Sequence, residues 1–183
     1  MKDIYQERYL EHIDRKQKYE CVGNYKHSNK DIISLLDVMQ HRRSQRVFNF
    51  EDITEKELDL IKFSVINAPS SCNRQAIYLK EEKPEYIEKH FRGANKWGKN
   101  ASKCYLVLAH KEAYKNPKEL PFMPYLDAGV VVENIYLMCE VLNIGCCFVN
   151  PNCNLEFEDY ICGTIMLGKY DKKAIEPPKR SEI

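Results

Sequence analysis

Apolar positions in the first third of the chain recur at the spacing of amphipathic helices. The first stripe follows Ser28-Asn29-Lys30-Asp31, a run typical of a capping box, and its helix is expected to end near residues 40–43. A second capping box begins at Thr54, and Ala68-Pro69 is expected to break the helix that follows it. The apolar positions are Ile32, Leu35, Leu36 and Met39 in the first helix and Leu58, Ile61 and Val65 in the second.

Denser apolar runs farther along the chain predict one long helix and several strands. The helix is expected from about Asp127 to Asn143, with enough apolar positions beyond the 3.6-residue stripe to predict burial nearly all round. Gly145 is interpreted as its C-terminal cap. A shorter helix is expected at 84–91, and strands are expected at 76–79, 104–110, 146–150 and 162–167.

This mixture of helices and strands predicts an α+β fold with layered packing. Residues 1–28 are polar, with few apolar positions, and are interpreted as an N-terminal arm. Residues 29–183 are interpreted as one domain. A chain of 183 residues is long enough to bury a substantial core without disulfide bonds.

The charge balance excludes several classes of partner. The chain has 28 basic and 27 acidic residues, so a net charge of +1 favours neither nucleic acid nor an anionic membrane, and any anion site must be local. No apolar run approaches the roughly 18 residues that a membrane-spanning helix needs. The first residues lack the apolar stretch of a secretory signal. A cytoplasmic protein is therefore expected.

The eight cysteines and five histidines do not form the patterns of a metal site. No two cysteines have the C-x-x-C spacing, and several lie inside apolar runs, where a reduced thiol behaves as a small hydrophobic group. Cys146 and Cys147 are adjacent, but neighbouring side chains of a strand point to opposite faces. We therefore expect reduced cysteines and no metal. If the protein is an enzyme, a cofactor is expected to supply the reactivity.

Three segments are candidates for binding a cofactor. In Arg42-Arg43-Ser44-Gln45-Arg46, three guanidinium groups and a hydroxyl lie within five residues, a set suited to binding phosphate; the alternative is a solvated basic helix end. The run from Asn67 to Gln75 combines small side chains with amide and hydroxyl donors; the alternative is a polar turn. The third segment combines Asp127-Ala128-Gly129 with residues 142–150. On its own it is interpreted as a core helix and strand.

Taken in order, these segments resemble the nitroreductase family. The basic segment with Val47-Phe48 is similar to the family's first motif, and Ala68-Pro69-Ser70-Ser71-Cys72-Asn73-Arg74-Gln75 is similar to its Ala-Pro-Ser-Ser-x-Asn-x-Gln-Pro motif. Asp127-Ala128-Gly129 and Asn134 match its central helix, and residues 142–148 match its Leu-Gly-x-Gly-x-x-Trp strand. The resemblance covers roughly residues 32–181 and implies a short, divergent member with a mixed or antiparallel sheet surrounded by helices.

The resemblance implies an FMN-dependent NAD(P)H oxidoreductase that passes electrons to a nitro, quinone or related acceptor in a ping-pong cycle. It also implies a homodimer with FMN at the subunit interface. The resemblance implies that Arg42, Arg43 and Ser44 bind the phosphate and the ribityl chain, with additional charge from Lys179 and Arg180. It places Arg46 near the flavin N1 and C2 oxygen. The remaining implied cofactor-binding residues are Ser70, Ser71, Asn73, Cys147, Phe148, Val149 and Asn150.

The sequence also departs from the family pattern. Ala76-Ile77 stands where the family has proline and an aromatic residue, and Phe148 stands in place of tryptophan. The stretch between Asn150 and Cys162 is shorter than in family members, which usually carry a helix there as part of the lid over the substrate pocket. This shortening motivates one alternative, a non-catalytic flavin-binding or scaffold module. A second alternative is an α+β domain that binds another anion through residues 42–46.

Overall fold

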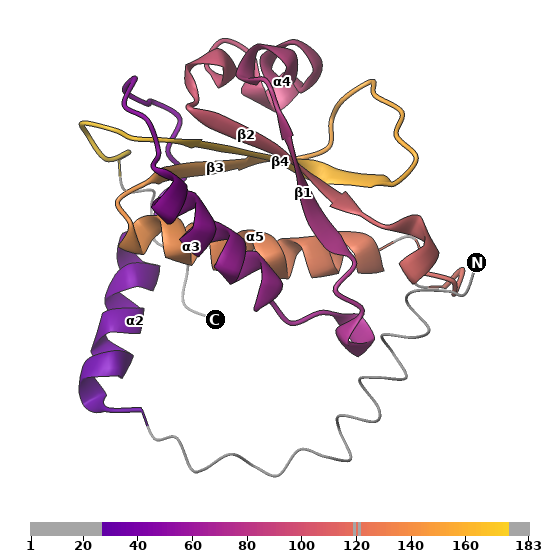
Figure 1. Ribbon diagram of the computed structural model, residues 1–183, viewed down its shortest axis with the longest axis horizontal. Coiled ribbons are helices and arrows are strands. Elements are labelled where there is room, and N and C mark those ends of the chain that lie inside the picture. Colours follow the sequence, from indigo (N-terminus) through magenta and orange to yellow (C-terminus); the bar gives the residue numbers. More distant parts are fainter. Residues whose placement is uncertain (1–26, 119, 121, 176–183) are drawn as a thin grey trace.

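Four α-helices and one four-stranded sheet form the part of the chain that the computed structural model describes, residues 27–118, 120 and 122–175 (Figure 1). The helices are α2 (Asn29–His41), α3 (Glu55–Ile66), α4 (Pro84–His90) and α5 (Met123–Val141). The strands are β1 (Ile77–Glu82), β2 (Lys103–Ala109), β3 (Gly145–Val149) and β4 (Tyr160–Gly168). Short 3-10 turns are η1 (Ser71–Asn73), η2 (Arg92–Ala94), η3 (Gly98–Asn100) and η4 (Lys111–Ala113). The α+β class predicted from the sequence is confirmed.

The sheet is antiparallel, with the strand order β1-β2-β4-β3. β2 and β4 are therefore central, and β3 has β4 on one side and a free edge on the other. The β2–β4 register shifts between Val107 and Leu108, which marks a bulge in the middle of the sheet. The free edge of β3 is the feature of this topology that matters for the candidate site.

Alternation along β2 divides the core into two halves. Tyr105, Val107 and Ala109 pack on the side of α3 and α5, whereas Cys104, Leu106 and Leu108 pack on the side of α4. Successive side chains of a strand point to opposite faces of the sheet. Residues 104–109 of β2 therefore contribute buried side chains to both halves of the core. The sheet thus has α5 and α3 against one face and α4 against the other (Figure 1).

The predicted starts of α2 and α3 are confirmed, and the predicted C-terminal cap of α5 is wrong. Ser28 with Asp31 and Thr54 with Glu57 each form a complete capping box. At the end of α5, the residue with left-handed backbone geometry is Asn143, with φ of 53°, and not Gly145, which begins β3. Asparagine adopts this geometry readily, because its short polar side chain bonds to the local backbone.

The boundaries of two other elements also differ from the prediction. α5 begins at Met123, ahead of the expected Asp127, because Pro124 occupies its first turn, where a missing backbone N–H costs nothing. β1 continues past residue 79 to Glu82, as its pairing with β2 extends to Cys104. The local apolar run identified the strand, but pairing with a neighbour set its length.

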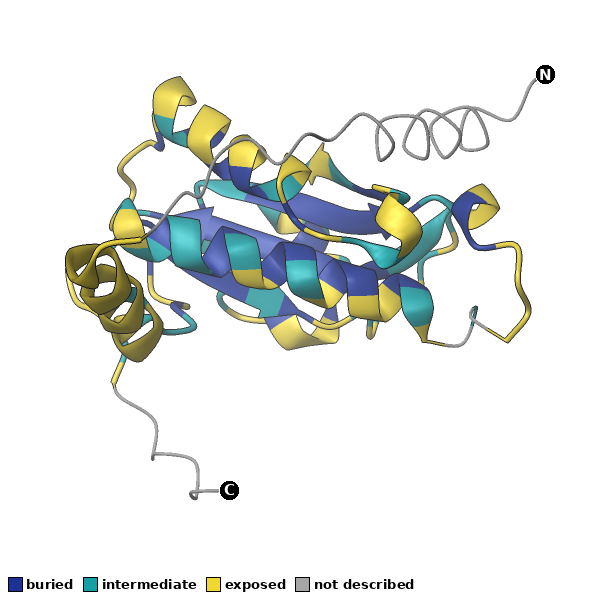
Figure 2. Ribbon diagram, turned by 90° about the horizontal axis from the view of Figure 1, so that it is seen from below, coloured by how far each residue is buried: buried dark blue, intermediate teal, exposed yellow. Residues whose placement is uncertain are grey.

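The apolar stripe of α2 is not buried in this chain. No residue of α2 is buried, and all of them except the half-buried Val38 are exposed (Figure 2). α5 is buried on one face only, so the predicted burial nearly all round is wrong within a single chain: Leu126 and Val141 are more than half exposed. The exposed large apolar side chains of α2 are Ile32, Ile33, Leu35, Leu36 and Met39.

The cysteines of the described segments carry free thiols, as expected. Five of them are buried: Cys104, Cys139, Cys146, Cys147 and Cys162. In the same residues no group of three or more metal-ligating side chains occurs, and no helix combines the length and hydropathy needed to cross a bilayer. The predicted arm at 1–28 falls almost wholly outside the described residues.

Candidate functional site

The basic segment forms a short addition to the free edge of the sheet. Arg42 caps the C-terminal end of α2, and its N–H donates to the carbonyl of Val38 at 3.0 Å. Ser44 then forms a parallel bridge with Cys146 of β3, and the N–H of Gln45 donates to the Cys146 carbonyl at 2.9 Å. Residues 42–46 therefore lie along β3, on the side that β4 leaves open.

Gln45 fixes this segment in place. Its side chain is 3% exposed, and its Nε2 donates to the carbonyls of Val47 at 2.6 Å and Lys172 at 3.1 Å. Its Oε1 accepts from the N–H of Ala174 at 2.8 Å. A Cβ on Gly145 would lie 2.6 Å from the Gln45 Cγ, so only glycine allows this close packing. Gln45 thus ties the basic segment to both β3 and residues 172–174.

Tyr136 of α5 joins Ser44, Arg42 and β3. Its hydroxyl accepts a hydrogen bond from the N–H of Phe148 at 2.7 Å and lies 3.2 Å from the Ser44 Oγ. The guanidinium of Arg42 lies over its ring, 4.8 Å from the ring centroid. Burial raises the pKa of Tyr136 to about 12, so its hydroxyl keeps its proton at neutral pH.

Arg46 interacts with Cys147 of β3, whereas Arg43 makes hydrogen bonds to the end of α2. Burial raises the pKa of the Cys147 thiol, while the charge of Arg46 and a hydrogen bond from it act in the opposite direction. Arg43 turns back onto the end of α2, where it donates to the carbonyls of Gln40 at 2.6 Å and Arg42 at 2.8 Å. The structure therefore brings Arg42, Ser44, Arg46, Cys147 and Phe148 together, with Arg43 held beside them.

The remaining predicted site residues in and after β3 differ in burial and in the neighbours that they contact. Val149 is buried, and Asn150 is exposed just beyond the strand. The ring of Phe148 packs directly against Gly163 of β4, where a Cβ would lie 2.3 Å from its Cζ. Lys179 and Arg180 lie outside the described residues.

The loop of Ser70, Ser71 and Asn73 has an unusual backbone. Cys72, Asn73 and Gln75 all have left-handed geometry, with φ of 53°, 52° and 50°. Such geometry is uncommon outside glycine, and its cost must be offset by the surrounding contacts. The Ser70 Oγ accepts from the N–H of Gln75 at 2.9 Å, and the Ser71 N–H donates to the Asp127 Oδ1 at 2.9 Å.

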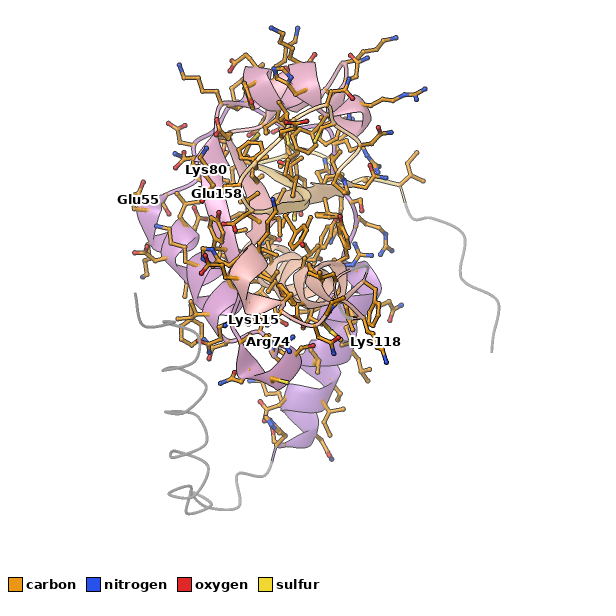
Figure 3. The ribbon with its side chains drawn as sticks, turned by 90° about the vertical axis from the view of Figure 1, so that its right-hand side faces the viewer. Glu55, Arg74, Lys80, Lys115, Lys118 and Glu158 are labelled. Atoms are coloured by element: carbon orange, nitrogen blue, oxygen red, sulfur yellow. The ribbon has the colours of Figure 1, made fainter. Side chains whose placement is uncertain are left out.

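Asp127 is the buried anchor of this loop. It is 3% exposed, and its Oδ2 accepts a hydrogen bond from the Tyr114 hydroxyl at 2.9 Å. Burial, together with this carboxylate, raises the pKa of Tyr114 well above its usual range. The guanidinium of Arg74 lies over the Tyr114 ring at 5.5 Å. Arg74 and Lys115, which follows Tyr114 in the chain, lie close together in Figure 3.

The two groups of predicted residues do not meet within one chain. The basic segment is anchored at Tyr136, and the Ser70–Asn73 loop is anchored at Asp127, near the other end of α5 (Figure 1). Because an α-helix rises about 1.5 Å per residue, these anchors are separated by roughly 13 Å along the axis. A single chain therefore keeps the two groups of predicted residues apart.

An apolar groove lies beside the C-terminal half of α5. It has a volume of about 410 Å³ and is formed by α2, α3 and α5. Exposed Phe63 and Val141 contribute to it, and the apolar side chains of α2 continue it. Its lining residues are Ser34, Leu35, Val38, Phe63, Ser64, Asn134, Leu137, Met138 and Val141.

Sequence reasoning assigned no role to Gln45, Asp127 or Tyr136. Gln45 enters the prediction only as a member of the basic segment, and Asp127 only as part of the segment that begins a helix. Tyr136 carries the one visible signal, a hydroxyl on the buried face of an otherwise apolar helix, where a partner is required. The partners themselves are distant in sequence.

Comparison with known proteins gives a consistent result at the level of fold. No protein-family model and no curated protein matches the sequence. Nitroreductase A from Vibrio parahaemolyticus is similar in structure, with a TM-score of 0.68 and 20% identity over 80% of this chain and 71% of that one. The NADPH:FMN oxidoreductase from Vibrio harveyi, complexed with NAD+, gives a TM-score of 0.68 and 18% identity over 80% and 73%.

A further similar structure contains a flavin. A protein from Desulfovibrio desulfuricans that is assigned as a nitroreductase, in complex with FMN, gives a TM-score of 0.65 and 19% identity. The alignment covers 84% of this chain and 94% of that one. At these identities the similarity concerns the fold, and it agrees with the resemblance found in the ordered sequence motifs. The chain therefore has the fold of the nitroreductases.

Proposed function

We propose that the chain binds FMN and acts as an NAD(P)H-dependent oxidoreductase. The observation that carries this proposal is the convergence of Arg42, Ser44 and Arg46 on one edge of β3, beside the backbone of Cys147 and Phe148. Two further observations support it: the V. harveyi protein of the same fold is an NADPH:FMN oxidoreductase, and the D. desulfuricans protein is in complex with FMN.

The donor set at this edge fits a phosphorylated flavin. Guanidinium groups and a hydroxyl suit a phosphate, because charged hydrogen bonds to an anion are stronger than neutral ones. Arg42, Arg43 and Ser44 would hold the phosphate and ribityl chain, with Lys179 and Arg180 as further cations. Arg46 would lie near the flavin N1 and C2 oxygen, where a guanidinium stabilises the negative charge that reduction creates.

Bound FMN would supply hydride acceptance from a nicotinamide and electron release to a second small molecule, such as a nitroaromatic compound or a quinone. The protein's part is then to hold the cofactor, set its potential and exclude water. Ser70, Ser71 and Asn73 would line the isoalloxazine ring, and the backbone of residues 147–150 would lie close to it. No side-chain acid or base is needed in this scheme.

The complete site is proposed to need two copies of the chain. Each copy would carry two half-sites, one anchored at Asp127 and the other at Tyr136 of α5, so the Ser70–Asn73 loop of one subunit would face the basic segment of the other. The exposed apolar side chains of α2 and the groove beside α5 offer the surface that such a homodimer would bury.

The test is an anaerobic reduction of the purified protein followed by absorbance. We expect a flavin band at about 450 nm that bleaches on addition of NADH or NADPH and returns with a quinone acceptor. The absence of flavin after purification, together with no uptake of added FMN, would overturn the proposal.

A non-catalytic flavin-binding module is the second candidate function. The observation that favours it is the connection from β3 to β4, residues 150–159, which contains no helix and so offers little cover for a substrate. Steady-state turnover with a quinone, above the rate given by free FMN, would exclude this second candidate. A flavin band that never bleaches with NAD(P)H would support it.

A further inference from the structure

Tyr136 occupies a position that the proposed function leaves without a role. It lies on the buried face of α5, it is 8% exposed, and its hydroxyl is close to two groups of the proposed flavin site. One is the backbone N–H of Phe148, at 2.7 Å, and the other is the Ser44 Oγ, at 3.2 Å. The question is what this hydroxyl imposes on its two neighbours.

The chemistry of the groups fixes the direction of one of these hydrogen bonds, whereas in the Ser44–Tyr136 pair either hydroxyl can donate. The Phe148 N–H can only donate, so the Tyr136 oxygen accepts from it. The phenol proton remains on the oxygen, because burial raises the pKa of Tyr136 to about 12. Its strongest acceptor nearby is the Ser44 Oγ, since the neighbouring Cys147 sulfur accepts only weakly.

When Tyr136 donates to Ser44, the Ser44 hydroxyl is left to donate outward. If the Ser44 oxygen accepts from Tyr136, its own hydrogen points elsewhere and is available for an acceptor at the edge of the site. A chain of bonds from N–H to phenol to serine is mutually polarising, so each donor is strengthened by the one before it. The Arg42 guanidinium lies over the same Tyr136 ring and adds positive charge to this region.

We propose that Tyr136 is a positioning residue that makes the Ser44 hydroxyl a donor toward a phosphate-bearing ligand, with the Phe148 amide as the fixed start of the relay. This inference rests on the proposed function, since it names how one group of that site is oriented. It concerns residues of this chain alone: an edge amide of β3, a tyrosine of α5 and a serine of the basic segment.

The test is FMN titration of flavin-free protein, followed by fluorescence quenching, in Tyr136→Phe, Ser44→Ala and the double variant. Phenylalanine keeps the ring under Arg42 and removes only the hydroxyl. We expect each single change to weaken FMN binding by about tenfold, and the double variant to match Ser44→Ala within about twofold, because Tyr136 acts through Ser44. Tyr125→Phe, at an exposed position of the same helix, is the matched control and should leave affinity unchanged.

The outcomes separate this inference from the proposed function. No FMN binding by the wild-type protein overturns the proposed function and the inference together. Wild-type binding with unchanged affinity in Tyr136→Phe overturns the inference alone, as do fully additive losses in the double variant, which a general packing role would produce. Should Tyr136→Phe not fold, hydrogen exchange of the wild-type protein decides: a Phe148 amide that exchanges as fast as an exposed amide overturns the relay, and a protected one supports it.

Discussion

The backbone N–H of Ser71 donates to the carboxylate of Asp127 at 2.9 Å, and this bond holds a strained loop against the start of α5. The second oxygen of the same carboxylate accepts from the Tyr114 hydroxyl. Asp127 thus satisfies two donors from different parts of the chain while remaining almost fully buried. The conformation of the Ser70–Asn73 loop depends on one side chain that is distant in sequence.

Replacing Asp127 with Asn should therefore destabilise the protein. The amide has one acceptor oxygen in place of two, so either the Ser71 N–H or the Tyr114 hydroxyl loses its partner, at a cost of about 1–3 kcal/mol. Urea unfolding measures the effect, with Glu133→Gln, an exposed carboxylate of the same helix, as the control. A loss no larger than that of the control would show that Asp127 does not anchor the loop.

Two glycine-to-alanine changes should have opposite effects on stability. At Gly163, a Cβ would lie 2.3 Å from the Phe148 Cζ and 2.6 Å from the Val149 carbonyl oxygen, and φ is +151°. Gly163→Ala should thus destabilise by about 1–3 kcal/mol, since the backbone atom cannot move aside cheaply. At Gly129, within α5, nothing lies within 4 Å of the added Cβ, and Gly129→Ala should stabilise by about 0.5–1 kcal/mol. Thermal melts of both variants provide the comparison, and equal shifts would contradict the packing described for Phe148.

Glu57 should make the stability of the protein dependent on acid pH. A hydrogen bond from Lys169, followed by bonds within the Thr54 capping box, lowers its pKa from 4.5 to about 2. A carboxylate whose pKa is lowered on folding stabilises the fold above its unfolded pKa, and this contribution is lost as pH falls from about 4.5 to about 2. Glu57→Gln should accordingly be less stable than wild type at pH 6, with the difference narrowing at pH 3. A difference that stays constant between the two pH values would refute the assignment.

Arg42 and Arg46 should have separable roles in the proposed flavin site. Arg42→Ala should weaken FMN binding, because the loss of one charged hydrogen bond costs about 1.5–3 kcal/mol. Arg46→Ala should lower the flavin midpoint potential, by about 30 mV for each 1.4 kcal/mol of lost stabilisation of the reduced form. FMN titration and anaerobic potentiometry measure the two effects. Lys89→Ala, at an exposed position of α4, is the control. If neither change affects FMN, the basic segment is not the phosphate site.

A charge on the apolar face of α2 should separate the proposed dimer. Leu35→Glu places a carboxylate in the groove beside α5 and should shift the protein to a monomer in sedimentation velocity. FMN affinity should fall with it, since each complete site needs both copies. Lys30→Glu, an exposed polar position of the same helix, should retain the wild-type assembly. A wild-type protein that sediments as a monomer with bound FMN would contradict the two-subunit site.

The elements that follow from local chemistry were predictable from the sequence. Both capping boxes lie where the Ser28 and Thr54 motifs place them, because the bonds join residues only three apart. The interpretation of Gly145 failed for the opposite reason. A glycine near a helix end suggests a cap, but the approach of Gln45 from another part of the chain is what requires this glycine.

The candidate site was predictable only as separate segments. Arg42, Ser44 and Arg46 were identified as a donor set, yet their contacts with β3 depend on the pairing of Ser44 with Cys146, about a hundred residues away. Tyr136 and Asp127 act through hydrogen bonds to elements far along the chain. A one-dimensional pattern records residue types and spacing, and it does not record which edge of a sheet remains free.

That free edge has a consequence for solubility. The outer edge of β1 carries the charged side chains Lys80, Glu81 and Glu82, which discourage the addition of a foreign strand. The edge of β3 has no such charges, and residues 42–46 cover it instead. The segment proposed to hold the cofactor thus also shields a strand with aggregation potential, so changes that loosen it should promote self-association of the chain as well as loss of the ligand.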